Sequence, residues 1–192
     1  MNKMKRALII IFLILLAFVA VFIFAGKEAS EKNETSPSQS QTAQEETDKE
    51  TEEKIKVPNF TALDEEGNEV ELYDFLGKPL VLNFWARWCG PCRAEMPDFD
   101  SAYKEHGEEI NFLMVNLTDG STETVESASE FIGLEGFSFP LLFDSTQEAA
   151  YLYGVYSIPM TFFVDAEGYL VARATGSIDG EMLKSGLDML ID

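Results

Sequence analysis

An unbroken apolar run follows a short basic segment at the start of the chain. Residues 7–25 contain no charge, glycine or proline. As a helix they would extend about 28 Å, which matches the hydrocarbon thickness of a bilayer. Lys3, Lys5 and Arg6 precede the run, and basic flanks stay on the cytoplasmic side. The pattern predicts a cytoplasmic N-terminus (residues 1–6) and a single-pass transmembrane signal anchor (residues 7–25), with everything that follows outside.

A cleaved signal peptide and a lipid anchor are the alternatives to a permanent anchor. The run is long for the apolar part of a signal peptide, and Ile23-Phe24-Ala25 is a poor small-x-small cleavage site because Ile23 is not small. No cysteine follows the run that could carry a lipid. The sequence therefore favours a protein that stays in the cytoplasmic membrane.

Residues 26–56 are polar and acidic. They contain no aromatic residue, and Ile55 is their only strongly apolar one. Such a segment cannot bury enough surface to offset the entropy lost on ordering. We expect a disordered linker with a root-mean-square reach on the order of 30 Å, which tethers the next domain near the membrane.

Residues 57–192 alternate between strand and helix patterns and have a normal size for one domain. Alternation around a Glu-Gly-Asn turn predicts an N-terminal hairpin, and short apolar runs predict buried strands. Helical spacing and a Ser/Thr start predict the helices. The expected elements are a hairpin at 59–77, strands at 79–86 and 110–118, helices at 92–105, 121–133 and 146–155, a strand pair at 160–176 and a helix at 179–191. This order predicts an α/β fold with a mixed sheet.

Charge excludes one class of partner. The chain has 14 basic and 34 acidic residues and a net charge of −20. The basic residues after Val57 are scattered, so no nucleic-acid surface is expected. Acidity instead favours solubility and repulsion from anionic lipid headgroups.

The only two cysteines, Cys89 and Cys92, lie in "FWARWCGPCRAEMP". A zinc site needs about four ligands, but the only histidine is His106 in a polar run, so we predict no metal and no cofactor. A structural disulfide across so short a loop would contribute only about 2 kcal/mol.

A redox pair explains more of the segment. Cys89 lies between a strand and a helix start, where free N–H groups and the helix dipole favour a thiolate, and Cys92 lies one turn inside the helix, placed to resolve a mixed disulfide.

The segment "FWARWCGPC" closely resembles the active site of thioredoxins. Together with "VPNFTALDEEGNEVELYDFLGKPLVLNFWA" and "YSIPMTFFVDAEGYLV", it identifies nearly all of residues 57–192 as similar to the ResA/TlpA group of tethered extracytoplasmic thioredoxin-like proteins. The resemblance implies a thioredoxin fold with an N-terminal hairpin extension. It also implies that Cys89 and Cys92 cycle between dithiol and disulfide.

The resemblance assigns three further positions beside the cysteines. Pro159 matches the proline whose preceding peptide bond is cis and which lies beside the disulfide. The backbone of Ile158 could then pair with an extended substrate segment. Trp88 matches the tryptophan beside the first cysteine, and it is either an apolar rim for docking or an ordinary packing residue.

Glu95 is the fourth position that the resemblance assigns. Thioredoxins of the cytoplasm carry a buried aspartate where this chain has Asn83, and asparagine cannot exchange the proton of Cys92. ResA-like proteins carry an active-site glutamate at the position of Glu95, which implies that Glu95 exchanges that proton. If Glu95 exchanges this proton, Glu95→Gln should shift the thiol titration and slow disulfide exchange while altering stability by less than about 1 kcal/mol, as a typical surface substitution does. The alternative is a first-turn acid that complements the helix dipole.

The expected function is a membrane-tethered extracytoplasmic thiol–disulfide oxidoreductase that reduces protein disulfides. A membrane thiol-relay protein is the implied electron donor, and oxidised apocytochrome c is one substrate that the family suggests. Two alternatives are a peroxiredoxin-like peroxide reductase and a copper-delivery protein. Peroxiredoxins carry a single reactive cysteine after a Pro-x-x-x-Thr run, and this chain has no such run before Cys89. Copper-delivery proteins of related fold carry Cys-x-x-x-Cys and a distant histidine, whereas His106 follows soon after the pair.

Overall fold

The structure, a computed structural model, describes residues 54–191 of the chain. The predicted cytoplasmic N-terminus (1–6), the predicted signal anchor (7–25) and residues 26–53 of the predicted linker lie outside this range. Within residues 54–191, no helix has the length and apolarity needed to cross a membrane.

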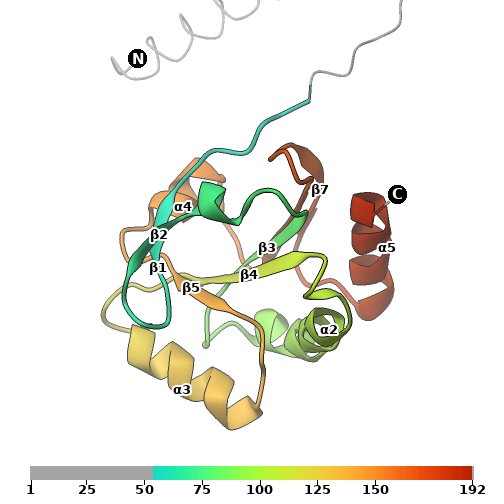
Figure 1. Ribbon diagram of the computed structural model, residues 1–192. Coiled ribbons are helices and arrows are strands. Elements are labelled where there is room, and N and C mark those ends of the chain that lie inside the picture. The colour runs from blue at the N-terminus through green and yellow to red at the C-terminus, as the bar shows by residue number, and fades with distance from the viewer. Residues whose placement is uncertain (1–53, 192) are drawn as a thin grey trace, which may run out of the picture. The chain divides into compact units, whose positions relative to one another are not determined.

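Seven strands form one mixed sheet in the order β2-β1-β5-β4-β3-β6-β7 (Figure 1). β3 is parallel to β4, and β4 is parallel to β5. On one side, β6 pairs antiparallel with β3 and β7 pairs antiparallel with β6. On the other side, β1 pairs antiparallel with β5 and β2 pairs antiparallel with β1. This arrangement confirms the predicted α/β thioredoxin-like fold. In chain order the elements are β1 (Thr61–Leu63), β2 (Glu69–Glu71), the 3-10 helix η1 (Leu72–Phe75), β3 (Leu80–Trp85), α2 (Gly90–His106), β4 (Asn111–Asn116), α3 (Val125–Glu135), β5 (Leu141–Phe143), α4 (Glu148–Leu152), β6 (Met160–Val164), β7 (Leu170–Thr175) and α5 (Gly180–Ile191).

Each face of the sheet carries its own apolar core. All six residues of β3 are buried, and because side chains alternate along a strand, Val81 and Trp85 pack on one side while Leu82 and Phe84 pack on the other. Figure 1 shows α2, α3 and α5 over the first face and α4 and η1 over the second. Asn83 shares the face of Val81 and Trp85. It therefore points toward α2, the helix that begins at the cysteines.

The N-terminal hairpin forms as predicted and is part of the sheet. β1 pairs antiparallel with β2, and Leu63 pairs with Phe143 of β5. Just before the hairpin, Leu170 N donates to Ile55 O at 2.8 Å and Lys56 forms a bridge with Tyr169. Backbone pairing with the domain thus begins two residues before the expected boundary at Val57.

Three elements differ from the sequence expectation, and one of them is α3, which begins at Val125 rather than at Ser121 because Thr124 is its N-cap residue. β5 was not predicted, because three residues are too few to show an alternation, yet it is fully buried and joins the hairpin to β4. α4 was predicted over 146–155 but covers only Glu148–Leu152. Its end is set by Gly154, which has a φ of 61° that most residues avoid.

Gly186 lets α5 lie directly on the sheet. A Cβ at this position would be 2.2 Å from Phe163 Cζ of β6, so an added methyl forces the helix away. We expect Gly186→Ala to lower the free energy of unfolding by about 1–3 kcal/mol, the cost of overpacking a core. The measurement is the urea midpoint of the full-length chain.

Gly133→Ala in α3 is the matched control. A Cβ there meets nothing within 4 Å, and alanine is the better helix former by up to about 1 kcal/mol. We expect this variant to be as stable as the original chain or more so. Two variants with the same midpoint would contradict the close approach of α5.

Candidate active site

The two cysteines form a disulfide at the junction between β3 and α2. Their Cα atoms are 5.3 Å apart. Cys89 is the N-cap residue of α2, and its Sγ accepts a hydrogen bond from Cys92 N at 3.2 Å. Cys89 is 5% exposed and Cys92 is fully buried. The local geometry therefore places the first sulfur at the positive end of a helix, where a thiolate is stabilised.

The loop before β6 lies against this disulfide. The Ile158–Pro159 peptide bond is cis, as predicted, and Ile158 O is 3.7 Å from Cys89 Sγ. Pro159 is buried and Ile158 is half-buried. The backbone of Ile158 thus lies beside the sulfur that the sequence marks as the attacking one.

Trp88 is exposed beside the disulfide rather than packed in the core. Its exposed fraction is 58%. Trp88 lines one groove together with residues of α2 and α3, including Arg93 and Phe131. It also lines a second groove, together with Leu117 and the loop that carries Tyr156 and Ile158. This exposure contradicts an ordinary packing residue, and the role of Trp88 as a docking rim stays a prediction.

Glu95 is buried between α2 and the sheet, with 2% of its surface exposed. Its Oε1 accepts from Asn83 Nδ2 at 2.9 Å and its Oε2 from Ile178 N at 2.9 Å. Burial raises the pKa of the carboxyl to about 7, although both hydrogen bonds lower that pKa. The expectation that Glu95→Gln changes stability by less than about 1 kcal/mol, as a surface substitution does, is therefore wrong, because this carboxyl is buried.

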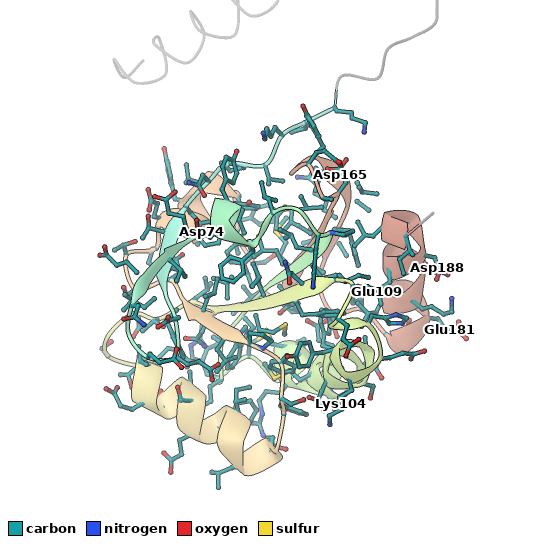
Figure 2. All side chains as sticks on the ribbon, in the orientation of Figure 1. Asp74, Lys104, Glu109, Asp165, Glu181 and Asp188 are labelled. Atoms are coloured by element: carbon teal, nitrogen blue, oxygen red, sulfur yellow. A yellow bond between two sulfur atoms is a disulfide. The ribbon has the colours of Figure 1, made fainter. Side chains whose placement is uncertain are left out.

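Several charged side chains of the helical layer lie in solvent, whereas Glu95, Asp100 of α2 and Glu123 before α3 are buried. Lys104, Glu181 and Asp188 lie at the periphery of the domain (Figure 2). A carboxyl that is buried beside a redox disulfide and titrates near neutrality is a candidate for proton transfer.

The structure adds a buried contact that sequence reasoning missed. Glu123, fully buried before α3, accepts from Arg87 N at 2.7 Å and from Asn116 Nδ2 at 2.7 Å. It thereby fixes the backbone just before Trp88. No sequence signal distinguishes this glutamate from its exposed neighbours, because its partners lie on two other segments.

The geometry does not bring His106 to the cysteines. His106 ends α2, which places it about 21 Å along the helix from Cys92 at 1.5 Å per residue. The part of the chain that the structure describes contains no group of three or more His, Cys, Asp or Glu side chains placed to hold a metal ion. The pair and the histidine therefore do not form one copper site.

Comparisons with known proteins identify the family of the chain. The sequence profile of the AhpC/TSA family matches residues 54–173. Thiol-disulfide oxidoreductase ResA of Bacillus thuringiensis (strain Al Hakam) is 37% identical over 134 residues, which are 68% of this chain and 74% of that protein.

Two solved structures share the fold. StoA from Bacillus subtilis has a TM-score of 0.59 at 27% identity, covering 68% of this chain and 96% of that one. A putative thiol:disulfide interchange protein DsbE from Chlorobium tepidum has a TM-score of 0.64 at 29% identity, covering 71% of this chain and 96% of that one. With the profile over more than half of its length and these relatives, the chain belongs to the thioredoxin-like AhpC/TSA family and is a thiol–disulfide oxidoreductase of the ResA type.

Proposed function

We propose that the protein is a membrane-tethered, extracytoplasmic reductase of protein disulfides. The observation that carries this proposal is the juxtaposition of Cys89 Sγ with Ile158 O at 3.7 Å and with exposed Trp88. An extended substrate segment can pair with the backbone of Ile158 while its disulfide meets Cys89. Trp88 then contacts apolar side chains of the substrate.

The reaction needs each of the two sulfurs in turn. Thiolate Cys89 attacks one sulfur of the substrate disulfide, forming a mixed disulfide and releasing the other substrate sulfur as a thiolate, which takes up a proton. Cys92 passes its thiol proton to the Glu95 carboxylate and attacks Cys89 Sγ. The mixed disulfide breaks, the second substrate sulfur leaves as a thiolate and also takes up a proton, and the protein is left with its Cys89–Cys92 disulfide while the substrate is a dithiol.

A further partner must return the protein to its dithiol form. Two electrons and two protons are needed for each disulfide reduced. Outside the cytoplasm, a membrane thiol-relay protein is the proposed donor. The resemblance to ResA-like proteins favours the oxidised haem-attachment cysteines of apocytochrome c as substrate, or the disulfide of another secreted protein.

The direction of the reaction is tested by the midpoint potential of the pair. Gly-Pro between the cysteines matches strongly reducing thioredoxins, so we expect a value nearer about −270 mV than about −120 mV. Equilibration of the full-length chain with glutathione or dithiothreitol buffers gives the value. We also expect Cys89 to be alkylated faster than Cys92 below neutral pH. A potential near about −120 mV would identify an oxidant and contradict the proposal.

The tether is tested separately from the chemistry. We expect the full-length chain to remain in the membrane fraction after salt and carbonate washing. Protease added from outside should release a fragment that begins near residue 57 and contains both cysteines. Mature protein that starts just after Ala25 would show that the apolar run is removed.

A further inference from the structure

The side chain of Asn83 contains a buried oxygen without a partner. Asn83 lies in the middle of β3 and is fully buried. Its Nδ2 donates to Glu95 Oε1 at 2.9 Å and to Thr161 Oγ1 at 3.0 Å, but its Oδ1 has no hydrogen-bond partner. A buried acceptor without a donor costs free energy, so this arrangement needs an explanation.

The observed orientation of the amide suits only one protonation state of Glu95. Both of the carboxyl's oxygens accept, one from Asn83 Nδ2 and one from Ile178 N. A carboxylate can accept in this way, but a protonated carboxyl needs an acceptor for its O–H. In the present orientation Asn83 offers it an N–H group instead.

Turning the amide by half a revolution about its Cβ–Cγ bond exchanges Oδ1 and Nδ2. Oδ1 would then face Glu95 Oε1 and could accept its proton. The contact with Thr161 survives the exchange, because a hydroxyl donates as readily as it accepts. The same two contacts thus serve both protonation states, and the unpartnered oxygen marks the place that the nitrogen takes after the turn.

We propose that the Asn83 amide is a positioning group that follows the proton of Glu95, donating from Nδ2 to the carboxylate and turning to accept at Oδ1 from the protonated acid. This inference rests on the proposed role of Glu95 in exchanging the proton of Cys92. Asn83 cannot exchange a proton itself, but in this way it takes part in the proton exchange of Glu95. The amide carries no proton of its own but gives both states of Glu95 a hydrogen bond.

Few other groups face the Glu95 carboxyl. Asp98, one turn further along α2, raises its pKa, and the hydroxyl of Ser177 before α5 lowers it. Ser177 Oγ donates to Pro91 O at 3.3 Å and is the rival acceptor for the proton of Glu95. Cys92 becomes a second titrating neighbour, besides Asp98, when the disulfide is reduced.

The first experiment is an NMR titration of the oxidised full-length chain in detergent, with labelled asparagine side chains. We expect the two Asn83 Nδ2 proton resonances and the nitrogen resonance to shift together between pH 5 and 9, with the same midpoint as the Glu95 carboxyl carbon. Asn83 resonances that stay constant while Glu95 titrates would overturn the proposal. This measurement requires no variant and no activity.

The second experiment compares Asn83→Leu with Ser177→Ala. A charged acceptor forms the stronger hydrogen bond, so losing the amide should raise the Glu95 midpoint by about one pH unit, a tenfold change in proton affinity. Ser177→Ala should move it less. If Ser177→Ala moves the midpoint more than Asn83→Leu does, the serine is the partner and the inference fails. Absence of disulfide exchange in the unmodified chain would instead refute the proposed function. The NMR titration would still show whether the Asn83 amide responds to the protonation of Glu95.

Discussion

Replacing Cys92 with serine should turn the enzyme into a trap that keeps its substrate bound through Cys89. The first attack uses only Cys89, whose Sγ lies beside Ile158 O at 3.7 Å. Release of the substrate requires the second sulfur, which is fully buried one turn inside α2. Multiple turnover should fall by at least about a thousandfold, because the two sulfurs act as one unit, while the mixed disulfide accumulates in a stoichiometric burst.

The trap is read by non-reducing electrophoresis and mass spectrometry with a disulfide-bearing peptide as the probe. Cys89→Ser is the matched control, because it keeps one cysteine of the pair but removes the accessible one. It should form no adduct at neutral pH. An adduct of equal yield on Cys92 in the Cys89→Ser chain would contradict the assignment of the attacking sulfur.

Glu95→Gln should change both the stability and the pH dependence of the enzyme. The ordinary carboxyl pKa of 4.5 is raised to about 7 in the folded protein. A carboxyl with a raised pKa contributes stability that is fully present below about pH 4.5 and is lost as the pH rises through about 7. At about 1.36 kcal/mol per pKa unit, the 2.5-unit difference (7 − 4.5) corresponds to roughly 3 kcal/mol.

The expected result is therefore a difference that grows with pH. In the oxidised state, Glu95→Gln and the original chain should have similar stability near pH 5, and the variant should be more stable by up to roughly 3 kcal/mol near pH 9. In the reduced state, the variant should exchange disulfides more slowly, and its rate should lose the part of the pH dependence that comes from the Glu95 carboxyl. Chemical denaturation and stopped-flow exchange at matched pH values measure the two effects.

Asp144→Asn is a control for the removal of a buried acid. Burial raises the pKa of Asp144 as well, but its carboxyl accepts from Ala149 N and Ala150 N at the start of α4, away from the cysteines. Its replacement should alter stability and leave the pH profile of exchange unchanged. If Glu95→Gln behaves in the same way, Glu95 is a structural acid and the proton of Cys92 goes to water.

The sequence predicted those elements of the fold that depend on interactions between neighbouring residues. The continuous apolar run up to Ala86 predicted β3, and the helical spacing after Cys92 predicted α2, because both patterns involve only residues that are close together in the chain. The Glu-Gly-Asn turn predicted the hairpin. β5 escaped prediction because its three residues are held by partners on β1 and β4 rather than by a local pattern.

The sequence by itself determined where the redox chemistry lies. Cys89 and Cys92 between a strand and a helix, and the Ile-Pro segment before the next strand, are local patterns, and the structure places them together as expected. Spacing along the helix also placed Glu95 one turn from Cys92.

Only the tertiary structure decided that Glu95 is buried and that Asn83 is its partner. The two bonds that define this environment connect residues far apart in the chain, Asn83 with Thr161 over 78 positions and Glu95 with Ile178 over 83. Contacts at such separations arise when α2 and the segment before α5 close over the sheet. Desolvation, which sets the protonation of the carboxyl, is a property of that closure, and no single segment of the sequence contains it.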